Sequence, residues 1–156
     1  MSAPELVELA PEETYPLRQS VLRNGTPAKL VAFPEDNEPG AIHLGIRIAG
    51  ELVAVSTWIR RPHNDRPAIQ LRGMATAHHV QGTGIGGQLL EAGCQRAADT
   101  GVSIVWARAR DAALNFYQRH EFVIEGDGFI DANTNLPHHL VVRTLPVDAA
   151  NVSSND

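Results

Sequence analysis

The feature that most constrains the fold is a glycine-rich stretch in mid-chain, with the sequence Gln81-Gly82-Thr83-Gly84-Ile85-Gly86-Gly87. Residues 68–76 before it are typical of a strand, and residues 88–99 after it are typical of a helix. A glycine turn between a strand and a helix brings several backbone N–H groups and the positive end of the helix dipole to one point. The stretch therefore predicts a site for a phosphate-bearing ligand.

Two common nucleotide-binding motifs fit this stretch poorly. Gly82, Gly84 and Gly87 have the spacing of a Rossmann fingerprint, but that motif belongs in the first strand–helix turn and needs an acidic residue further on. Here the unit follows a hairpin, and the next predicted strand, residues 102–107, ends without an acid. A P-loop would require a Gly-Lys-Ser/Thr sequence, which is absent. A Rossmann oxidoreductase is therefore the least favoured interpretation.

The order of the other elements predicts the fold class. Alternating apolar residues at 42–48, followed by an apolar run at 52–58, predict a β-hairpin. A loop or broken helix is expected at residues 26–40. Further strands are expected at residues 6–9, 102–107, 122–130 and 139–145, and helices at residues 11–22 and 111–119. The order β-α-β-β-β-α-β-α-β-β predicts a mixed α/β fold with one layer of sheet and helices on both faces.

The helix after the glycine stretch is expected to pack on this sheet. Ile85, Leu89, Ala92 or Gly93, and Ala97 fall on one helical face. Cys94 in the same helix is expected to be a small buried apolar residue. Asp111 is expected to cap the next helix.

Length, charge and cysteine content exclude several classes of protein. The 156 residues are expected to form one domain at residues 1–147, followed by a disordered tail at residues 148–156. A formal net charge of −5 argues against a nucleic-acid-binding surface. The single cysteine cannot form an internal disulfide, no signal peptide is visible, and no apolar stretch approaches the roughly 18 residues that span a bilayer. A soluble cytoplasmic protein is therefore expected.

The neighbours of the glycine stretch resemble a known family. Gln81-x-x-Gly84-x-Gly86, after a strand ending in Met74-Ala75-Thr76, resembles the acyl-CoA-binding motif of the GNAT superfamily of N-acyltransferases, Arg/Gln-x-x-Gly-x-Gly/Ala. A second signature of the family is similar to Asn115-Phe116-Tyr117 followed by His120-Glu121-Phe122-Val123. The resemblance covers nearly the whole chain. It implies a sheet of about seven strands, splayed where CoA binds, with acetyl-CoA as the acyl donor and no metal.

The resemblance also implies a role for individual residues. Amides of the glycine stretch would hold the pyrophosphate of CoA, and Met74 and Thr76 would pair with the pantetheine arm. The same strand can offer an N–H to the developing oxyanion. Tyr117 matches the general acid that protonates the departing thiolate. The implied cofactor-binding residues are Met74, Ala75, Thr76, Gln81, Gly82, Thr83, Gly84, Ile85, Gly86, Gly87 and Asn115.

The general base is left open by the sequence. Many relatives have a glutamate on the strand before the glycine motif, and the aligned residue here is Gln70, whose amide cannot accept a proton. Histidine has a suitable ordinary pKa, and a chain of water molecules would serve equally. The candidate side chains are His43, His138, His139, Glu35 and Asp36.

Two other polar patterns allow functional interpretations. His78 and His79 are adjacent on a segment expected to be extended, where their side chains would point to opposite sides and make a poor metal chelate. The acidic run of Glu35, Asp36 and Glu38 is either a solvated loop or an entrance for a cationic amine.

The sequence as a whole favours an acetyl-CoA-dependent N-acetyltransferase that acts on a small-molecule amine by direct attack. The alternative is a non-catalytic acyl-CoA-binding sensor or scaffold with the same fold. No nucleic-acid or membrane partner is expected, and the resemblance is compatible with a homodimer. Neither the acceptor nor the acyl chain length is indicated by any motif.

Overall fold

Seven strands form one mixed sheet in the order β1-β2-β3-β4-β5-β7-β6 in the computed structural model, which describes residues 2–27 and 29–146. All neighbouring strands pair antiparallel except β4 and β5, which are parallel. The strands are β1 (Glu5–Leu9), β2 (Ile42–Ile48), β3 (Glu51–Arg60), β4 (Ile69–Thr76), β5 (Ile104–Arg110), β6 (Val123–Ile130) and β7 (Pro137–Thr144). The tail expected at residues 148–156 lies outside the described residues.

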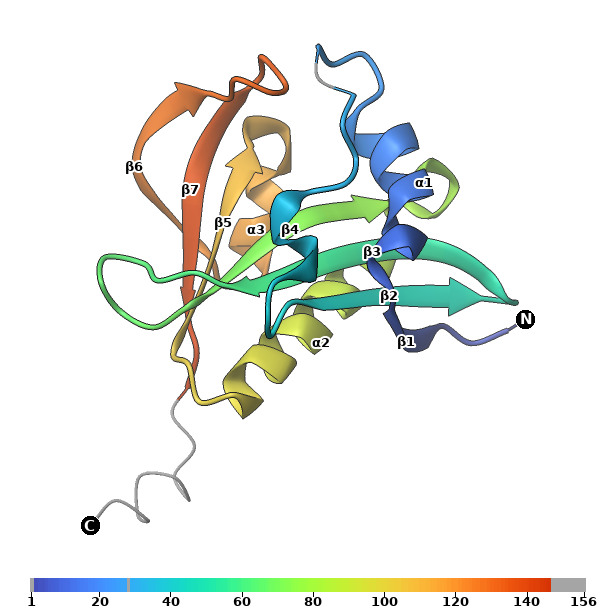
Figure 1. Ribbon diagram of the computed structural model, residues 1–156, viewed down its shortest axis with the longest axis horizontal. Coiled ribbons are helices and arrows are strands. Elements are labelled where there is room, and N and C mark those ends of the chain that lie inside the picture. Colours follow the sequence, from blue (N-terminus) through green and yellow to red (C-terminus); the bar gives the residue numbers. More distant parts are fainter. Residues whose placement is uncertain (1, 28, 147–156) are drawn as a thin grey trace.

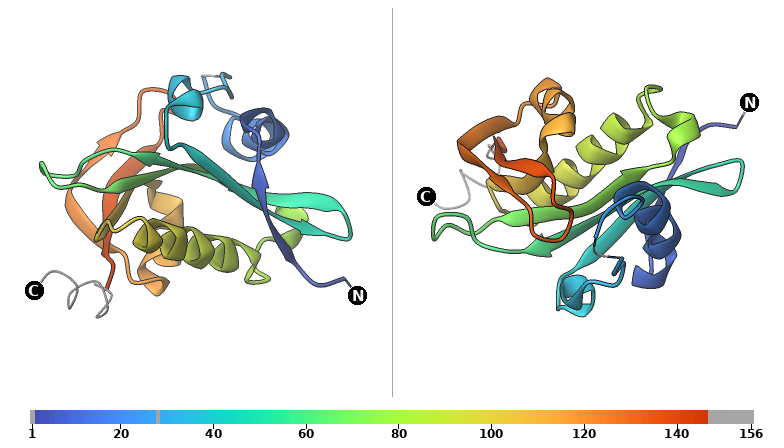
Figure 2. Two further views of the ribbon diagram at one scale, coloured as in Figure 1. Left: turned by 60° about the horizontal axis from the view of Figure 1, so that its bottom comes forward. Right: turned by 90° about the horizontal axis from the view of Figure 1, so that it is seen from above.

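Helices lie on both faces of the sheet, as predicted. Helices α2 (Ile85–Asp99) and α3 (Leu114–Arg119) cover one face, and the early helical segment (residues 11–22) lies on the other (Figure 1; Figure 2). The early segment begins and ends where the sequence predicts but is not a regular α-helix. It consists of a 3-10 turn (Pro11–Thr14), α1 (Tyr15–Leu17) and a π-helical turn (Arg18–Leu22). Within the described residues, no helix has both the length and the apolar composition to span a bilayer.

The sheet opens between β4 and β5. Their parallel pairing covers only Ile69, Leu71 and the residue between them, opposite Val105–Ala107. From Arg72 to Thr76, β4 has no partner on that side and diverges from β5 (Figure 1). An extra β4 residue opposite β3 produces a bulge at the same point, where Gly73 has a φ of 59°. A bulge increases the local bend and twist of a strand, so it directs the end of β4 away from β5.

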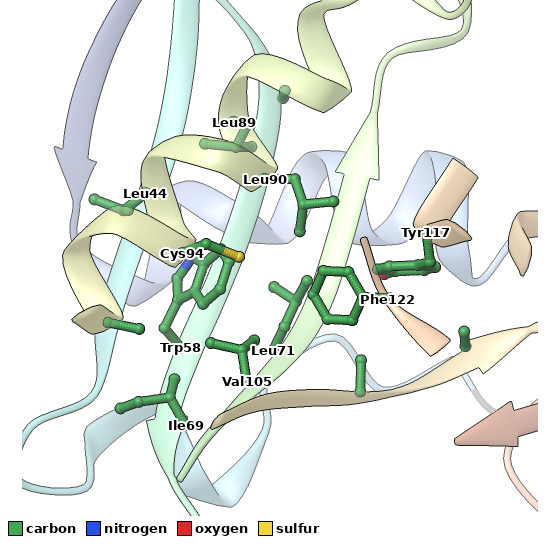
Figure 3. Close-up of a cluster of buried hydrophobic side chains, with 14 of the residues drawn as sticks. Leu44, Trp58, Ile69, Leu71, Leu89, Leu90, Cys94, Val105, Tyr117 and Phe122 are labelled. Carbon is green, nitrogen blue, oxygen red and sulfur yellow. The ribbon is translucent and has the colours of Figure 1, made fainter. Parts of the chain in front are cut away.

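Close packing of α2 on the sheet positions the glycine stretch. The predicted apolar face is buried, with Ile85, Leu89 and Ala97 each no more than 5% exposed. The indole of Trp58 lies directly beneath α2 beside Cys94 (Figure 3). A Cβ atom added at Gly93 would lie 1.7 Å from the Trp58 ring, so only glycine fits at this crossing. Cys94 is buried as expected, and burial raises the pKa of its thiol to about 12.

The start of α3 differs from the prediction. The strand expected at residues 102–107 runs on to Arg110, and Asp111 opens a 3-10 turn without making a side-chain cap. The Asp111 carboxylate instead contacts His139 Nδ1 on β7, at 2.7 Å. The cap is lost because the carboxylate has a charge-assisted partner across the sheet.

A buried polar network joins the early helical segment to the sheet. Arg18 is fully buried and donates two hydrogen bonds to Asp36, at 2.8 and 2.9 Å, and one to Thr57 Oγ1, at 2.8 Å. The Thr57 hydroxyl then donates to His43 Nδ1, and His43 Nε2 donates to the Asp36 carbonyl. Every buried charge in the network thus has a partner, which is the condition for tolerating it in the interior.

Candidate active site

A cavity of about 940 Å³ occupies the opening between β4 and β5 on the face covered by α2 and α3. We refer to it as the larger cavity. Its walls are the end of β4, the glycine stretch, the first turns of α2, and α3. The predicted residues that line it are Met74, Ala75, Thr76, Gln81, Gly82, Gly84, Gly86, Gly87 and Tyr117.

The glycine stretch has the backbone geometry that the sequence suggests. Gly82 and Gly84 have φ values of 80° and 91°, a region that favours glycine, and Gly84 is the N-cap of α2. The Gln81 side chain donates to the Thr76 carbonyl at 2.9 Å and so ties the loop to the end of β4. The cavity therefore has the N-terminus of a fifteen-residue helix in its wall, and Arg119 is among its other lining residues. This combination suits a phosphate group.

Three of the predicted cofactor-binding residues do not line the larger cavity. Asn115 is exposed on α3, and the cavity is lined by its neighbours Ala112, Ala113 and Phe116 instead. The Thr83 hydroxyl donates to the Val80 carbonyl, and the Ile85 side chain is buried in the core. The backbone amides of Thr83 and Ile85 still lie beside the start of α2, whereas Asn115 lies outside the lining of this cavity.

Tyr117 lies at the inner end of the larger cavity. Its ring packs edge-on against Phe116 and Phe122, with centroids 5.3 Å away in each case. Figure 3 shows the contact with Phe122. Its side chain is buried, and burial raises the pKa of the phenol well above its ordinary value. The phenol therefore stays protonated at neutral pH and can donate a proton or a hydrogen bond to an anion formed beside it.

A second, smaller cavity of about 270 Å³ adjoins the first on the opposite face of the sheet. The two cavities share four lining residues, Val21, Met74, Ala113 and Tyr117. The smaller cavity is also lined by Gln70, Phe33 and His138, and by four arginines, which are Arg23, Arg72, Arg108 and Arg110. Tyr117 thus stands where a ligand in one cavity would meet a ligand in the other.

The candidate histidine bases differ in whether they line a cavity. Both ring nitrogens of His43 are engaged in the buried network, and His139 contacts Asp111 away from both cavities. His138 is different, because it lines the smaller cavity. Its Nδ1 is 2.9 Å from the Leu136 carbonyl, which can only accept, so a neutral His138 carries its free lone pair on Nε2.

The acidic run is neither a solvated loop nor an entrance for a cation. Glu35 and Asp36 are buried and Glu38 is half-exposed, and each contacts an arginine, respectively Arg72, Arg18 and Arg61. These ion pairs fix the 3-10 turn (Pro34–Asn37) against the sheet.

The histidine pair lies in a 3-10 turn (His78–Val80), not on an extended segment. His79 contacts the exposed Glu51 at 3.3 Å. In the part of the chain that the structure describes, no group of three His, Cys, Asp or Glu side chains is placed to hold a metal ion.

The arginines of the smaller cavity were missed from the sequence. The strand was expected at residues 102–107, yet β5 continues through Arg108 and Arg110. The alternation of alanine and arginine could have indicated the longer strand. Ala107 and Ala109 are buried on one face, and Arg108 and Arg110 lie on the other face and line the smaller cavity. The larger cavity is also lined by Phe116, Arg119 and His120, which were not predicted as binding residues from the sequence.

Comparisons with known proteins agree with this architecture. The sequence model of the acetyltransferase (GNAT) family matches residues 5–122. The uncharacterized N-acetyltransferase YitI of Bacillus subtilis (strain 168) is 27% identical over 118 residues, which cover 74% of this chain and 79% of YitI.

Solved structures show the same fold at low sequence identity. FeeM, an N-acyl amino acid synthase from uncultured soil microbes, superimposes with a TM-score of 0.80 at 13% identity, covering 94% of this chain and 93% of FeeM. An acyl-CoA N-acyltransferase from Pseudomonas aeruginosa gives 0.76 at 18% identity, covering 91% of this chain and all of the other. The family match covers most of the sequence, and the sheet and its splayed strands confirm the resemblance. The chain therefore belongs to the acetyltransferase (GNAT) family of acyl-CoA-dependent N-acyltransferases.

Proposed function

We propose that this protein transfers an acetyl group from acetyl-CoA to the amine of a small molecule by direct attack, with Tyr117 as the general acid. The observation that carries the proposal is the meeting of the two cavities at Tyr117. The larger cavity has the glycine stretch and helix start for the CoA pyrophosphate, and the unpaired edge of β4 for the pantetheine arm. The smaller cavity is left for the acceptor.

The chemistry follows from this arrangement. The amine nitrogen attacks the thioester carbonyl, and an N–H on the free edge of β4 stabilises the oxyanion. The C–S bond then breaks, and Tyr117 gives its proton to the thiolate. The attacking nitrogen loses one proton, which we assign to Nε2 of His138 on the far wall of the smaller cavity.

Acetyl-CoA binding is the first test of this function. Acetyl-CoA at about a hundred times its Kd should stabilise the protein by about 2.7 kcal/mol, seen as a raised thermal unfolding midpoint. NAD serves as the control ligand and should have no effect. Release of free CoA thiol with a panel of amines then distinguishes an enzyme from a sensor that only binds acyl-CoA. The absence of any stabilisation by acetyl-CoA would contradict the proposed function.

Replacement of His138 by glutamine tests the assignment of the base. The variant should lose about a hundredfold in kcat/KM, because general base catalysis contributes on the order of 10²–10⁴. The Kd for acetyl-CoA should stay the same, because His138 does not line the larger cavity. His43→Gln is not a suitable control because it breaks the buried network, whereas His79→Gln changes only an exposed side chain. An unchanged kcat/KM in His138→Gln would remove His138 from this role.

A further inference from the structure

The smaller cavity carries an excess of positive charge that the protein itself does not neutralise. Four arginines and one carboxylate, Asp131, line it. Arg108 contacts Asp131 at 3.0 Å, and Arg72 contacts Glu35 from outside the lining. With both carboxylates included, two positive charges remain, in a chain whose formal net charge is −5. A local field opposite in sign to that of the whole protein indicates a site for an anion.

The two uncompensated arginines are Arg23 and Arg110. The Arg23 Nε donates to the Leu30 carbonyl at 3.0 Å, and Arg110 Nη2 donates to the Leu22 carbonyl at 2.5 Å. Among residues 2–27 and 29–146, no carboxylate forms an ion pair with either guanidinium. A guanidinium has five N–H donors, and both residues line the cavity, so each can donate to a ligand there as well.

The charges of this cluster are close enough to act on one another. Burial lowers the pKa of Arg110, the positive charge of Arg23 lowers it further, and the charge of Asp131 opposes both. Burial also lowers the pKa of Arg23, with Arg18 adding to the effect and Asp131 opposing it. The arginines remain protonated, so the folded protein holds partly desolvated cations that repel each other. A bound anion would relieve both the desolvation and the repulsion.

The Asp131 carboxylate offsets only part of this desolvation and repulsion, because the pKa values of Arg23 and Arg110 remain lowered despite its charge. Its Oδ2 atom accepts hydrogen bonds from the backbone of Asn133 and from the backbone and hydroxyl of Thr134, at 3.0–3.2 Å. Its Oδ1 atom accepts from Arg108. Asp131 is therefore held in its own turn and leaves Arg23 and Arg110 for a ligand.

We propose that the acceptor is a small amine that carries an anionic group, a carboxylate or a phosphate, bound by Arg23 and Arg110. This inference rests on the proposed function and names the substrate class of the same site. The cavity volume of about 270 Å³ lies at the small end of ligand sites, which suits a compact metabolite. The forked donors of arginine match both anions. The amine would then face Tyr117 and His138, which line the same cavity.

The same charges help the reaction as well as binding. A positive field disfavours a protonated ammonium and so favours the neutral amine, which is the nucleophile. Arginines that hold the anion thus also raise the fraction of acceptor that can attack. A pocket for a purely cationic acceptor such as a polyamine would need the opposite charge.

Matched acceptors test the proposal on the full-length protein. With saturating acetyl-CoA, amino acids and short ω-amino acids are compared with their own carboxamides, and aminoalkyl phosphonates form a separate arm. We expect the acids to be used at least tenfold better, in kcat/KM, than the carboxamides. Preference for carboxylate or for phosphonate identifies the anion, and either supports the proposal. Equal use of acids and carboxamides would overturn it.

The variant Arg110→Gln tests whether Arg110 binds the anionic group of the acceptor. The variant should raise KM for the acidic acceptor about ten- to hundredfold, which is the usual effect of losing a charge-assisted hydrogen bond. The Kd for acetyl-CoA, measured by calorimetry, shows whether the variant is folded, because Arg110 does not line the larger cavity. Arg110→Lys should keep part of the preference. Arg66→Gln, on an exposed turn away from both cavities, is the control. An unchanged acid-to-amide ratio in Arg110→Gln would contradict the assignment.

Calorimetry separates this inference from the proposed function. The probes are the same acids and carboxamides, titrated into the CoA complex of the wild type and of Arg110→Gln. If an acid binds in an Arg110-dependent way but no acetyl group is transferred, the anion site stands and the proposed function fails. If acetyl transfer occurs without preference for acids, the proposed function stands and the anion site fails.

Discussion

Replacing Tyr117 with phenylalanine is expected to lower kcat by about a hundredfold or more while leaving the Kd for acetyl-CoA nearly unchanged. General acid catalysis contributes on the order of 10²–10⁴ in rate, and the substitution removes only the hydroxyl. The ring would keep its packing on Phe116 and Phe122, so the cavity keeps its shape. Steady-state kinetics for kcat and calorimetry for CoA binding measure the two quantities separately.

Tyr15→Phe provides the matched control for this experiment. The chain has two tyrosines, and Tyr15 lines neither cavity, so removal of its hydroxyl should not change turnover. Because burial raises the pKa of Tyr117, the wild type should show no alkaline loss of activity from ionisation of this phenol near its ordinary pKa of about 10. Full activity in Tyr117→Phe would show that the thiolate leaves without a proton from this residue.

Replacing Asp36 with asparagine is expected to lower the free energy of unfolding by about 3–5 kcal/mol. The variant keeps the side-chain shape but leaves Arg18, which is fully buried, without its counter-charge, and loss of one partner of a buried ion pair has this effect. Urea unfolding followed by circular dichroism measures the change. A loss comparable to that of a surface substitution would show that Arg18 is solvated in the folded protein.

The control for Asp36→Asn is Glu38→Gln in the same segment. Glu38 contacts Arg61 at 2.6 Å, but both side chains are more than a third exposed, so the change in stability should be small. The effect of Asp36 should also depend on pH. Burial raises the pKa of Asp36, but hydrogen bonds from Arg18 and Phe33 outweigh it and hold the pKa below its ordinary value. The contribution of Asp36 to the free energy of unfolding is therefore complete above the ordinary pKa of a free aspartate. It is lost as the pH falls through the lowered pKa of Asp36 in the folded protein.

Local patterns predicted the scaffold and most of the residues that line the larger cavity. The glycine stretch, the apolar face of α2 and the alternating hairpin each depend on neighbours in sequence, so their periodicity was enough to predict them. The smaller cavity depends on residues far apart in sequence. Arg23, Arg72 and Arg110 belong to three different elements and meet only because β4 and β5 separate. Charged residues at the end of β5 resemble a strand terminus when the cavity beside them is unknown.

The acidic run shows the same limit. Its residues were interpreted as a surface feature because carboxylates are rarely buried. Their partners, Arg18, Arg61 and Arg72, lie 18 to 37 positions away, and no short-range pattern connects them. Similarly, Asn115 fits the family signature in sequence but is exposed on α3 and does not line the larger cavity.

The glutamine at position 70 has a consequence for selectivity. Gln70 lines the smaller cavity beside Arg72 and Arg108, at a position where relatives often place a glutamate. A carboxylate there would place a negative charge in the cavity and reduce its excess of positive charge. The neutral amide leaves that excess unchanged. Under the proposed function, a single glutamine would thus both remove a base from β4 and favour an acidic acceptor, and proton removal would be left to a side chain on another strand.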